Sequence, residues 1–169
     1  MRVNLGAGGR IMEGWVNQDI RDLPNIELVC DALNIDNCLS PSSVSHFYSR
    51  HFFEHLTFKQ GKDLLEKKLW LLKPGGKVEM VLPDLTFHCK QFVDEYYPSV
   101  EGFERVEHAL GSLFGWQRES DESLWDVHKS GYSFETLSAV LKSVGYINPY
   151  RMKSVDPWHL HIVAFKGED

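Results

Sequence analysis

The sequence has few cysteines, no long apolar run and no excess of positive charge. Its three cysteines, Cys30, Cys38 and Cys89, have no paired spacing, which argues against a disulfide framework or a thiolate metal site. No apolar segment approaches the ~20 residues of a membrane span, and a glycine cluster begins too early to leave room for a signal peptide. The formal net charge of -6 argues against non-specific binding of nucleic acid, which depends on clustered Lys and Arg. We therefore expect a cytoplasmic protein with no membrane span and no nucleic-acid partner.

The order of apolar and polar segments predicts a single α/β domain over residues 1–169. Strand-like segments alternate with helix-like ones, as in layered α/β proteins. No repeat or linker divides the chain. The predicted strands cover residues 2–5, 14–20, 26–30, 44–49, 77–82, 146–153 and 160–165.

Helix signals occur in four segments. Thr57 and Gln60 have the spacing of a capping box, and that helix is predicted to end at Lys73-Pro74-Gly75-Gly76. Apolar residues between 100 and 113 suggest a further helix, and Ser133 and Gly145 delimit the last one. Pro83-Asp84 opens the remaining helix, whose inner side is predicted to hold Leu85, Cys89, Phe92, Val93 and Tyr96.

A glycine cluster, Gly6-Ala7-Gly8-Gly9, follows the first predicted strand. Without Cβ atoms, such a loop lets a ligand lie against the backbone. A dinucleotide fingerprint would need a third glycine at position 11, where Ile11 stands, so NAD binding is disfavoured. Only residues 6–13 separate this strand from the next, whereas a parallel crossover normally takes a dozen or more. Either the first crossover is abbreviated to a turn or the second strand is misassigned.

Two acidic residues end the next two predicted strands. Asp19 is placed to accept hydrogen bonds from both hydroxyls of a ribose, the alternative being a solvated turn aspartate. Asp31 is placed to accept from an adenine amino group, with Ala32 and Leu33 against the ring. The alternative for Asp31 is a helix N-cap.

Residues 51–55, His-Phe-Phe-Glu-His, match the inverted zinc-peptidase pattern H-x-x-E-H. On a helix the two histidines would share one face and hold a metal ion. The pattern follows a predicted strand instead, so we expect no metal, with one histidine capping a turn and the other packing. A metalloenzyme built on His51, Glu54 and His55 is kept as an alternative.

In combination these segments resemble the class I S-adenosylmethionine-dependent methyltransferases, and most closely the small type-11-like members. The resemblance covers nearly the whole chain in the family's order. It rests on segments 3–9, 14–19, 30–33, 49–56, 71–77 and 132–146. It implies a Rossmann-like seven-stranded sheet, mostly parallel with one antiparallel strand, and helices on both faces. Here the first crossover is abbreviated relative to the family.

The resemblance also implies S-adenosylmethionine as cofactor and S-adenosylhomocysteine as product. The residues expected to bind the cofactor are Asn4, Leu5, Gly6, Ala7, Gly8, Asp19, Ile20, Asp31, Ala32, Leu33, Ser49, Arg50 and His51.

The methyl acceptor is expected to be a small molecule, with a sugar or polysaccharide precursor as one candidate. The Asn/Asp-Pro-Pro-aromatic tetrapeptide of enzymes that methylate amino groups of DNA is absent after the fourth predicted strand, which argues against DNA as the acceptor. Residues 98–128 are the expected substrate cap. Trp116, Trp125 and Tyr132 would form a stacking wall for the acceptor or anchor the cap into the core. If a hydroxyl is methylated, a base must take its proton. The base candidates are His128, His51 and His88. The alternative function is a catalytically inactive cofactor-binding domain that acts as a partner or regulatory protein.

Overall fold

The computed structural model describes residues 1–117, 126–153 and 156–168 of the 169-residue chain. Within these residues seven strands form one sheet in the order β3-β2-β1-β4-β5-β7-β6. Strand β7 is antiparallel to both of its neighbours, and the other pairs are parallel. The predicted fold class, a Rossmann-like and mostly parallel seven-stranded sheet, is confirmed. The strands are β1 (Arg2–Leu5), β2 (Val16–Asp19), β3 (Leu28–Val29), β4 (Val44–Arg50), β5 (Leu72–Pro83), β6 (Ile147–Arg151) and β7 (His159–Phe165).

The described helices are two short 3-10 helices and four α-helices. The capping boxes predicted at Thr57 and Ser133 are present, and Gly145, with a φ of 114°, ends the last helix. None of the described helices combines the length and apolar character needed to cross a membrane. The helices are η1 (Ala32–Asn37), η2 (Phe53–His55), α1 (Phe58–Leu71), α2 (Leu85–Val93), α3 (Arg105–Phe114) and α4 (Phe134–Val144).

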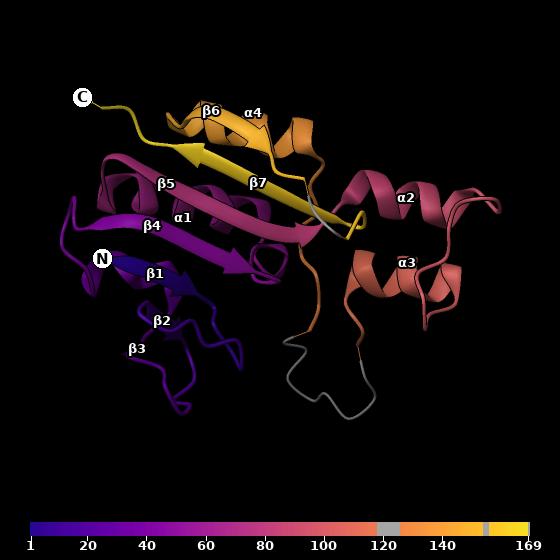
Figure 1. Ribbon diagram of the computed structural model, residues 1–169, viewed down its shortest axis with the longest axis horizontal. Coiled ribbons are helices and arrows are strands. Elements are labelled where there is room, and N and C mark those ends of the chain that lie inside the picture. Colours follow the sequence, from indigo (N-terminus) through magenta and orange to yellow (C-terminus); the bar gives the residue numbers. More distant parts are fainter. Residues whose placement is uncertain (118–125, 154–155, 169) are drawn as a thin grey trace.

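The hydrophobic core lies between one face of the sheet and helices α1 and α4 (Figure 1). Alternate residues of β5, Val78, Met80 and Leu82, point to this face and are buried. Leu64 and Leu65 of α1 pack in the same cluster. The alternation follows from the pleat of a strand, in which successive side chains point to opposite faces.

The prediction of helices on both faces is wrong for the described residues. No described helix packs on the second face of the sheet, which carries Tyr48, Glu79 and His161. Helices on that face would come from the β1–β2 and β2–β3 connections. From β1 to β3 the chain moves along the sheet in the direction opposite to that from β4 to β5, and right-handed crossovers in the two directions place their helices on opposite faces. Both connections contain only turns and bends. The abbreviated first crossover is thus confirmed, and it leaves this face without a described helix.

Several strand boundaries differ from the prediction. Strand β2 begins at Val16 rather than at residue 14, because its pairing with β1 begins there. Strand β3 is reduced to Leu28–Val29, because only these two residues pair with β2. Strand β5 begins at Leu72, five residues before the predicted start, because Leu72 already pairs with Val44 of β4. Lys73-Pro74-Gly75-Gly76 therefore lies at the start of β5.

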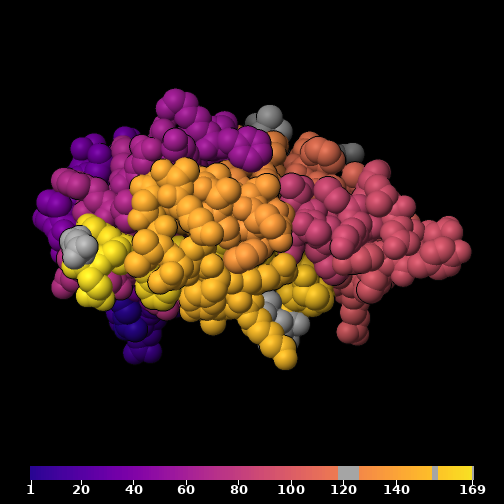
Figure 2. Space-filling view, turned by 90° about the horizontal axis from the view of Figure 1, so that it is seen from above, coloured from indigo at the N-terminus to yellow at the C-terminus, as the bar shows by residue number. Residues whose placement is uncertain are grey.

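Helices α2 and α3 form a hairpin beyond the carboxyl ends of β1, β4 and β5 (Figure 1). In the space-filling view, α2 and the turn after it form a narrow projection at one end (Figure 2). The predicted inner side of α2 is wrong, because its buried residues are Phe87, His88 and Gln91. A polar contact to α3 replaces the expected apolar one, since Gln91 Oε1 lies 3.0 Å from Nδ1 of His108. The residues wrongly placed inside, Cys89, Phe92, Val93 and Tyr96, are exposed.

Candidate functional site

The glycine loop after β1 has two residues in left-handed conformations. Gly6 has a φ of 65° and Gly8 a φ of 52°, a region that is costly for residues with a Cβ atom. At Gly6 the requirement is also steric, because a Cβ atom there would lie 2.4 Å from Cδ2 of Phe52. At Gly9 such an atom would meet nothing described within 4 Å. The loop therefore lies close against the segment that follows β4.

Side-chain amides hold the abbreviated crossover in place of a helix. Asn4 Nδ2 donates to the carbonyl oxygen of Arg10 at 2.8 Å and to Oδ1 of Asn17 at 2.9 Å. The N–H of Gly6 donates to Oε1 of Gln18 at 3.1 Å. Sequence reasoning missed Asn17 and Gln18. The available signal was a run of three polar residues, 17–19, that fills a short predicted strand between Val16 and Ile20.

Asp19 ends β2 beside the glycine loop, where the sequence predicts it. Its carboxylate accepts from the N–H of Gly8 at 2.8 Å and from the N–H and Nε of Arg21, each at 3.0 Å. Burial alone would raise the pKa of Asp19, but the bonds from Arg21 and Gly8 outweigh it and lower the pKa. The sequence prediction did not include Arg21, whose side chain is 63% exposed. An exposed guanidinium thus lies over the carboxylate.

The second acidic residue, Asp31, is the N-cap of η1, and its Oδ1 accepts from the N–H of Leu33 at 2.9 Å. This is the cap that the sequence offers as one of two roles. Ala32 is buried in the core, and Leu33 packs at its edge. Ile20, directly after Asp19, is 50% exposed. An exposed apolar side chain next to a buried acid is a surface on which a flat ring can lie.

The segment after β4 carries a strained residue. Ser49 is buried, while His51 has a φ of 50°, which is uncommon for a residue other than glycine and concentrates at functional sites. The Nδ1 atom of His51 lies 3.2 Å from Oε1 of Glu54. Arg50 Nη2 lies 3.9 Å from a carboxylate oxygen of Asp156. The turn thus places these polar residues at the carboxyl end of β4.

The three base candidates have different surroundings. His88 is 1% exposed, its Nδ1 lies 3.2 Å from Gln91 Oε1, and its Nε2 lies 3.1 Å from the carbonyl oxygen of Trp158. Burial lowers the pKa of His88 to about 4. Since both ring nitrogens are engaged, one within α2 and one with the segment before β7, we set His88 aside as a base.

His128 keeps one ring nitrogen available. Its Nδ1 lies 2.8 Å from the carbonyl oxygen of Ser112, so that Nδ1 carries the proton and Nε2 the lone pair. Burial lowers the pKa of His128, which favours the neutral form. Its ring packs edge-on against His55, with centroids 4.9 Å apart.

The aromatic residues predicted to stack on an acceptor are dispersed. Tyr132 is 2% exposed and packs against Phe53 and Phe58, so it anchors the chain into the core. Trp116 packs against Phe103 of the hairpin, with ring centroids 5.3 Å apart. Trp125 lies outside the described residues. The cap predicted over residues 98–128 stays a prediction, since residues 118–125 also fall outside the described ones. The helical hairpin to which it belongs begins earlier, at α2.

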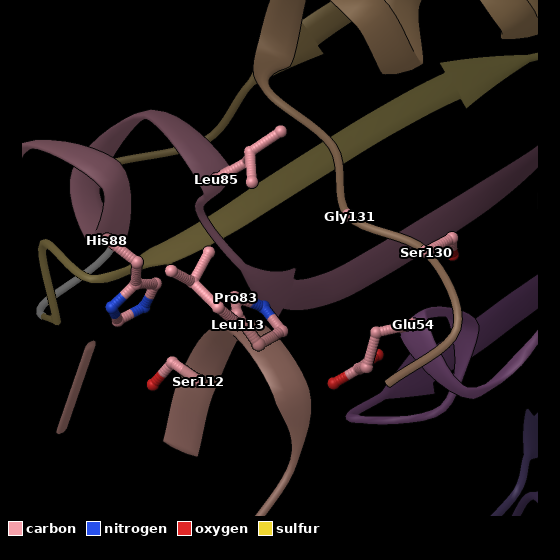
Figure 3. A pocket seen from close by; sticks show the side chains of 8 residues that line it. All are labelled: Glu54, Pro83, Leu85, His88, Ser112, Leu113, Ser130 and Gly131. Carbon is pink, nitrogen blue, oxygen red and sulfur yellow. The ribbon is translucent and has the colours of Figure 1, made fainter. Parts of the chain in front are cut away.

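Two hollows border the hairpin. A small one of about 20 Å³ lies between Glu54 and His88 (Figure 3), which is room for about one water molecule. A larger one, of about 440 Å³, lies between α2 and the segment before β7 and is lined by residues such as Phe87 and Trp158. Figure 3 also shows that Glu54 lies next to the chain segment of Ser130.

No known family model matches the chain, and no curated protein matches it either. Solved structures do match in fold. A methyltransferase dependent on S-adenosylmethionine from Archaeoglobus fulgidus is 14% identical, with a TM-score of 0.61 over 97% of this chain and 85% of that one. The 1,6-didemethyltoxoflavin-N1-methyltransferase of Burkholderia thailandensis, solved with S-adenosylhomocysteine, is 12% identical, with a TM-score of 0.59 over 98% of this chain and 70% of that one.

Human N-acetylserotonin methyltransferase, solved with S-adenosylmethionine, is 13% identical with a TM-score of 0.58, and the match covers 98% of this chain and 47% of that one. Three further matched structures are also longer, and the chain spans 61%, 36% and 48% of their lengths. At these identities the likeness concerns the fold, in particular the strand order and the single antiparallel strand. The chain has the fold of the class I S-adenosylmethionine-dependent methyltransferases.

Proposed function

We propose that the chain binds S-adenosylmethionine at the carboxyl ends of β1, β2 and β4 and transfers its methyl group to a small-molecule acceptor. The observation that carries the proposal is the junction of Gly8 and Asp19. A left-handed glycine donates its N–H to a carboxylate at the end of the neighbouring strand. In open α/β sheets, ligands bind outside the carboxyl ends of the strands where the strand order reverses, and β1 is that point here.

Each part of the cofactor has a proposed partner. The backbone of Gly6 and Gly8 lies along the methionine part, and carbonyl oxygens of residues 49–51 accept from its amine. Asp19 accepts from the ribose hydroxyls, for which Arg21 must move aside or share the carboxylate. The exposed side chain of Ile20 packs on the adenine, together with residues 31–33.

In the proposed reaction the acceptor atom attacks the methyl carbon in line with the carbon–sulfur bond. That bond breaks, and its electron pair stays on sulfur as S-adenosylhomocysteine forms. The sulfonium methyl group is already electrophilic, so the protein mainly aligns the partners and excludes water. A hydroxyl acceptor also loses its proton, and we assign its uptake to Nε2 of His128, which keeps a lone pair because Nδ1 bonds the carbonyl oxygen of Ser112.

Replacing Asp19 by alanine tests the cofactor assignment. Hydrogen bonds to a charged group contribute about 1.5 to 3 kcal/mol, so we expect Asp19→Ala to weaken binding by about 10- to 100-fold. Calorimetric titration with S-adenosylmethionine measures this. Asp22→Ala is the matched control, because Asp22 is a nearby exposed acid, and we expect it to bind like the wild type. No heat from the wild type at millimolar ligand would refute the function, and unchanged binding in Asp19→Ala would refute the role of Asp19.

A second candidate is a domain that binds the cofactor without catalysis and serves as a partner or regulatory protein. The observation that favours it is the second face of the sheet, on which no described helix packs and which carries polar side chains such as Glu79 and His161. Incubation with labelled S-adenosylmethionine and a pool of small acceptors separates the two functions. Transfer of label to any acceptor supports the enzyme, and binding without transfer supports the partner protein.

The acceptor class and location are further parts of the proposal. A sugar or polysaccharide precursor is the acceptor we favour, since the hollow bordered by α2 is lined by both aromatic and polar residues. We place the protein in the cytoplasm, because its three cysteines are free and two of them are exposed, as expected in a reducing compartment.

A further inference from the structure

Glu54, His55 and His128 come together where η2 meets the segment before α4. One ligand atom from each lies within 4.8 Å of the others. Glu54 is 1% exposed, and its Oε1 lies 3.2 Å from Nδ1 of His51. Its other oxygen, Oε2, is buried and has no hydrogen-bond partner among the described residues. A buried carboxylate oxygen without a partner is costly, so this atom is suited to bind a cation.

Both histidines are oriented as metal ligands are. Nδ1 of His55 lies 3.2 Å from the carbonyl oxygen of Val127, and Nδ1 of His128 lies 2.8 Å from that of Ser112. Each Nδ1 therefore donates to a carbonyl, which leaves the lone pair on Nε2. Such bonds to the second nitrogen fix the tautomer and ring orientation of metal-binding histidines.

The backbone holds the two segments together. The N–H groups of Lys129 and Ser130 donate to the carbonyl oxygen of Glu54 at 2.8 and 3.1 Å. The N–H of His128 donates to the carbonyl oxygen of Phe114 at 3.2 Å. The ligands are therefore positioned by backbone hydrogen bonds on both sides.

We propose that Glu54, His55 and His128 bind a divalent transition-metal ion. Two imidazole nitrogens and one carboxylate suit Zn²⁺, Mn²⁺ or Fe²⁺ better than Mg²⁺ or Ca²⁺, which prefer oxygen ligands. Ligand atoms on a tetrahedral zinc ion, at bonds of about 2.0 to 2.1 Å, are about 3.4 Å apart. Binding therefore requires the three side chains to close by no more than about 1.5 Å.

The site differs from the one expected of the H-x-x-E-H pattern. His51 and His55 do not share a helix face, because η2 covers only Phe53–His55. The second histidine ligand comes instead from His128, far along the chain. The proposed site therefore departs from the sequence prediction, which expected no metal ion.

Three protein ligands leave at least one position of the ion open. Phe52 packs against Gly6, and Glu54 follows two residues later in the chain, so we infer that the ion would bind on the side of the cofactor loop. This part rests on the proposed function: the open position would hold the oxygen of a hydroxyl acceptor and lower its pKa, as metal ions do for bound water. With the ion bound, Nε2 of His128 is a ligand and no longer the base assigned above, so the acceptor's proton would pass to solvent.

The first test is zinc binding by chelator-treated full-length protein, measured by calorimetry and by metal content after desalting. We expect one Zn²⁺ per chain, and at least about tenfold weaker binding in Glu54→Gln and His128→Asn. His161→Gln is the matched control, because its imidazole bonds Glu79 at 2.9 Å on the second face of the sheet, and it should bind zinc like the wild type. Failure of the wild type to retain zinc, or equal affinity in all four proteins, overturns the proposal.

Thermal unfolding gives a readout that needs no activity. At a zinc concentration about 100 times the Kd, the Tm of the wild type should rise by about 5 to 10 °C. His128→Asn should show no such rise. Glu54→Gln should remain folded without zinc, because glutamine has nearly the same shape and removes the charge of a buried carboxylate that has one oxygen without a hydrogen-bond partner. A zinc-dependent rise of equal size in both variants and the wild type contradicts the site.

The open position is tested with Co²⁺ in place of zinc. Addition of acetohydroxamate, an oxygen chelator, should change the visible absorption spectrum of the cobalt-loaded protein, and an unchanged spectrum overturns the acceptor role while leaving the metal site. Cofactor binding is measured separately on the same samples. Zinc binding without S-adenosylmethionine binding would therefore refute the proposed function and leave the metal site standing.

Discussion

Replacing Lys68 by methionine is expected to raise the free energy of unfolding by about 3 kcal/mol at pH 7. Lys68 lies in α1 and is 1% exposed. Its Nζ lies 4.0 Å from Sδ of Met80 and 5.7 Å from the ring centroid of Phe53. No carboxylate of the described residues forms an ion pair with it. Burial lowers the pKa of Lys68 from 10.5 to about 7, so its charge opposes folding.

The pH dependence identifies the cause. Between pH 7 and 10.5 the unfolded chain keeps the Lys68 proton while the folded chain releases it, so stability rises with pH in this range. From pH 7 to pH 9 the rise from this group is about 2 kcal/mol. Lys68→Met lacks it, and its advantage over the wild type should therefore shrink by that amount.

Urea unfolding of both proteins at pH 7 and pH 9 measures the difference. The control is Lys62→Met in the same helix, because the side chain of Lys62 is 51% exposed. This replacement should change the free energy of unfolding by no more than about 0.5 kcal/mol. An advantage of Lys68→Met that is the same at both pH values would contradict the titration of this lysine. Loss of stability in the variant would show that the ammonium contributes more than its burial costs.

Replacing Gly6 by alanine is expected to destabilise the fold by about 2 to 4 kcal/mol and to abolish measurable binding of S-adenosylmethionine. Gly6 has a φ of 65°, and an added Cβ would lie 2.4 Å from Cδ2 of Phe52. The aromatic ring is packed at the edge of the core, so either it or the loop must move. Gly9→Ala is the control, because nothing described lies within 4 Å of its Cβ position. It should lie within about 0.5 kcal/mol of the wild type.

A double-mutant cycle with Phe52→Ala separates the steric effect from the backbone effect. Removal of the ring relieves the overlap, so the two substitutions together should cost less than the sum of the single ones by about 1 kcal/mol or more. Unfolding in urea gives all four free energies. Strict additivity would show that the left-handed backbone alone causes the loss. A cost in Gly9→Ala equal to that in Gly6→Ala would contradict the account of the loop altogether.

The parts of the candidate site that directly follow a strand lie at the carboxyl edge of the sheet, as expected from the sequence, while their role in binding stays a prediction. The glycine loop, Asp19 and the turn after β4 each follow a strand, and the carboxyl ends of parallel strands meet at one edge of a sheet. Local pattern therefore located them. Arg21 over Asp19, and Asn17 and Gln18 under the loop, were not predicted, because their roles depend on which atoms face them across strands.

Helix α2 shows why a face can be misjudged. Its apolar residues Phe92, Val93 and Tyr96 suggested an inner side, but α3 packs against His88 and Gln91. Polar side chains can be buried when each forms a hydrogen bond. The partner of Gln91 is His108, which lies on another helix, so the pattern of α2 alone does not reveal it. The same reasoning applies to Lys68, which the pattern of α1 places beside core leucines without showing that its ammonium is buried as well.

By itself the sequence determined the alternation of strands and helices, the caps at Thr57 and Ser133, and the glycine loop with Asp19 after it. These features depend on residues close in the chain, through period, capping and the absence of Cβ atoms. Only the tertiary structure decided that no described helix packs on one face of the sheet and that His128 meets Glu54 and His55. Both depend on chain crossings and on burial, which bring together atoms that local pattern cannot relate.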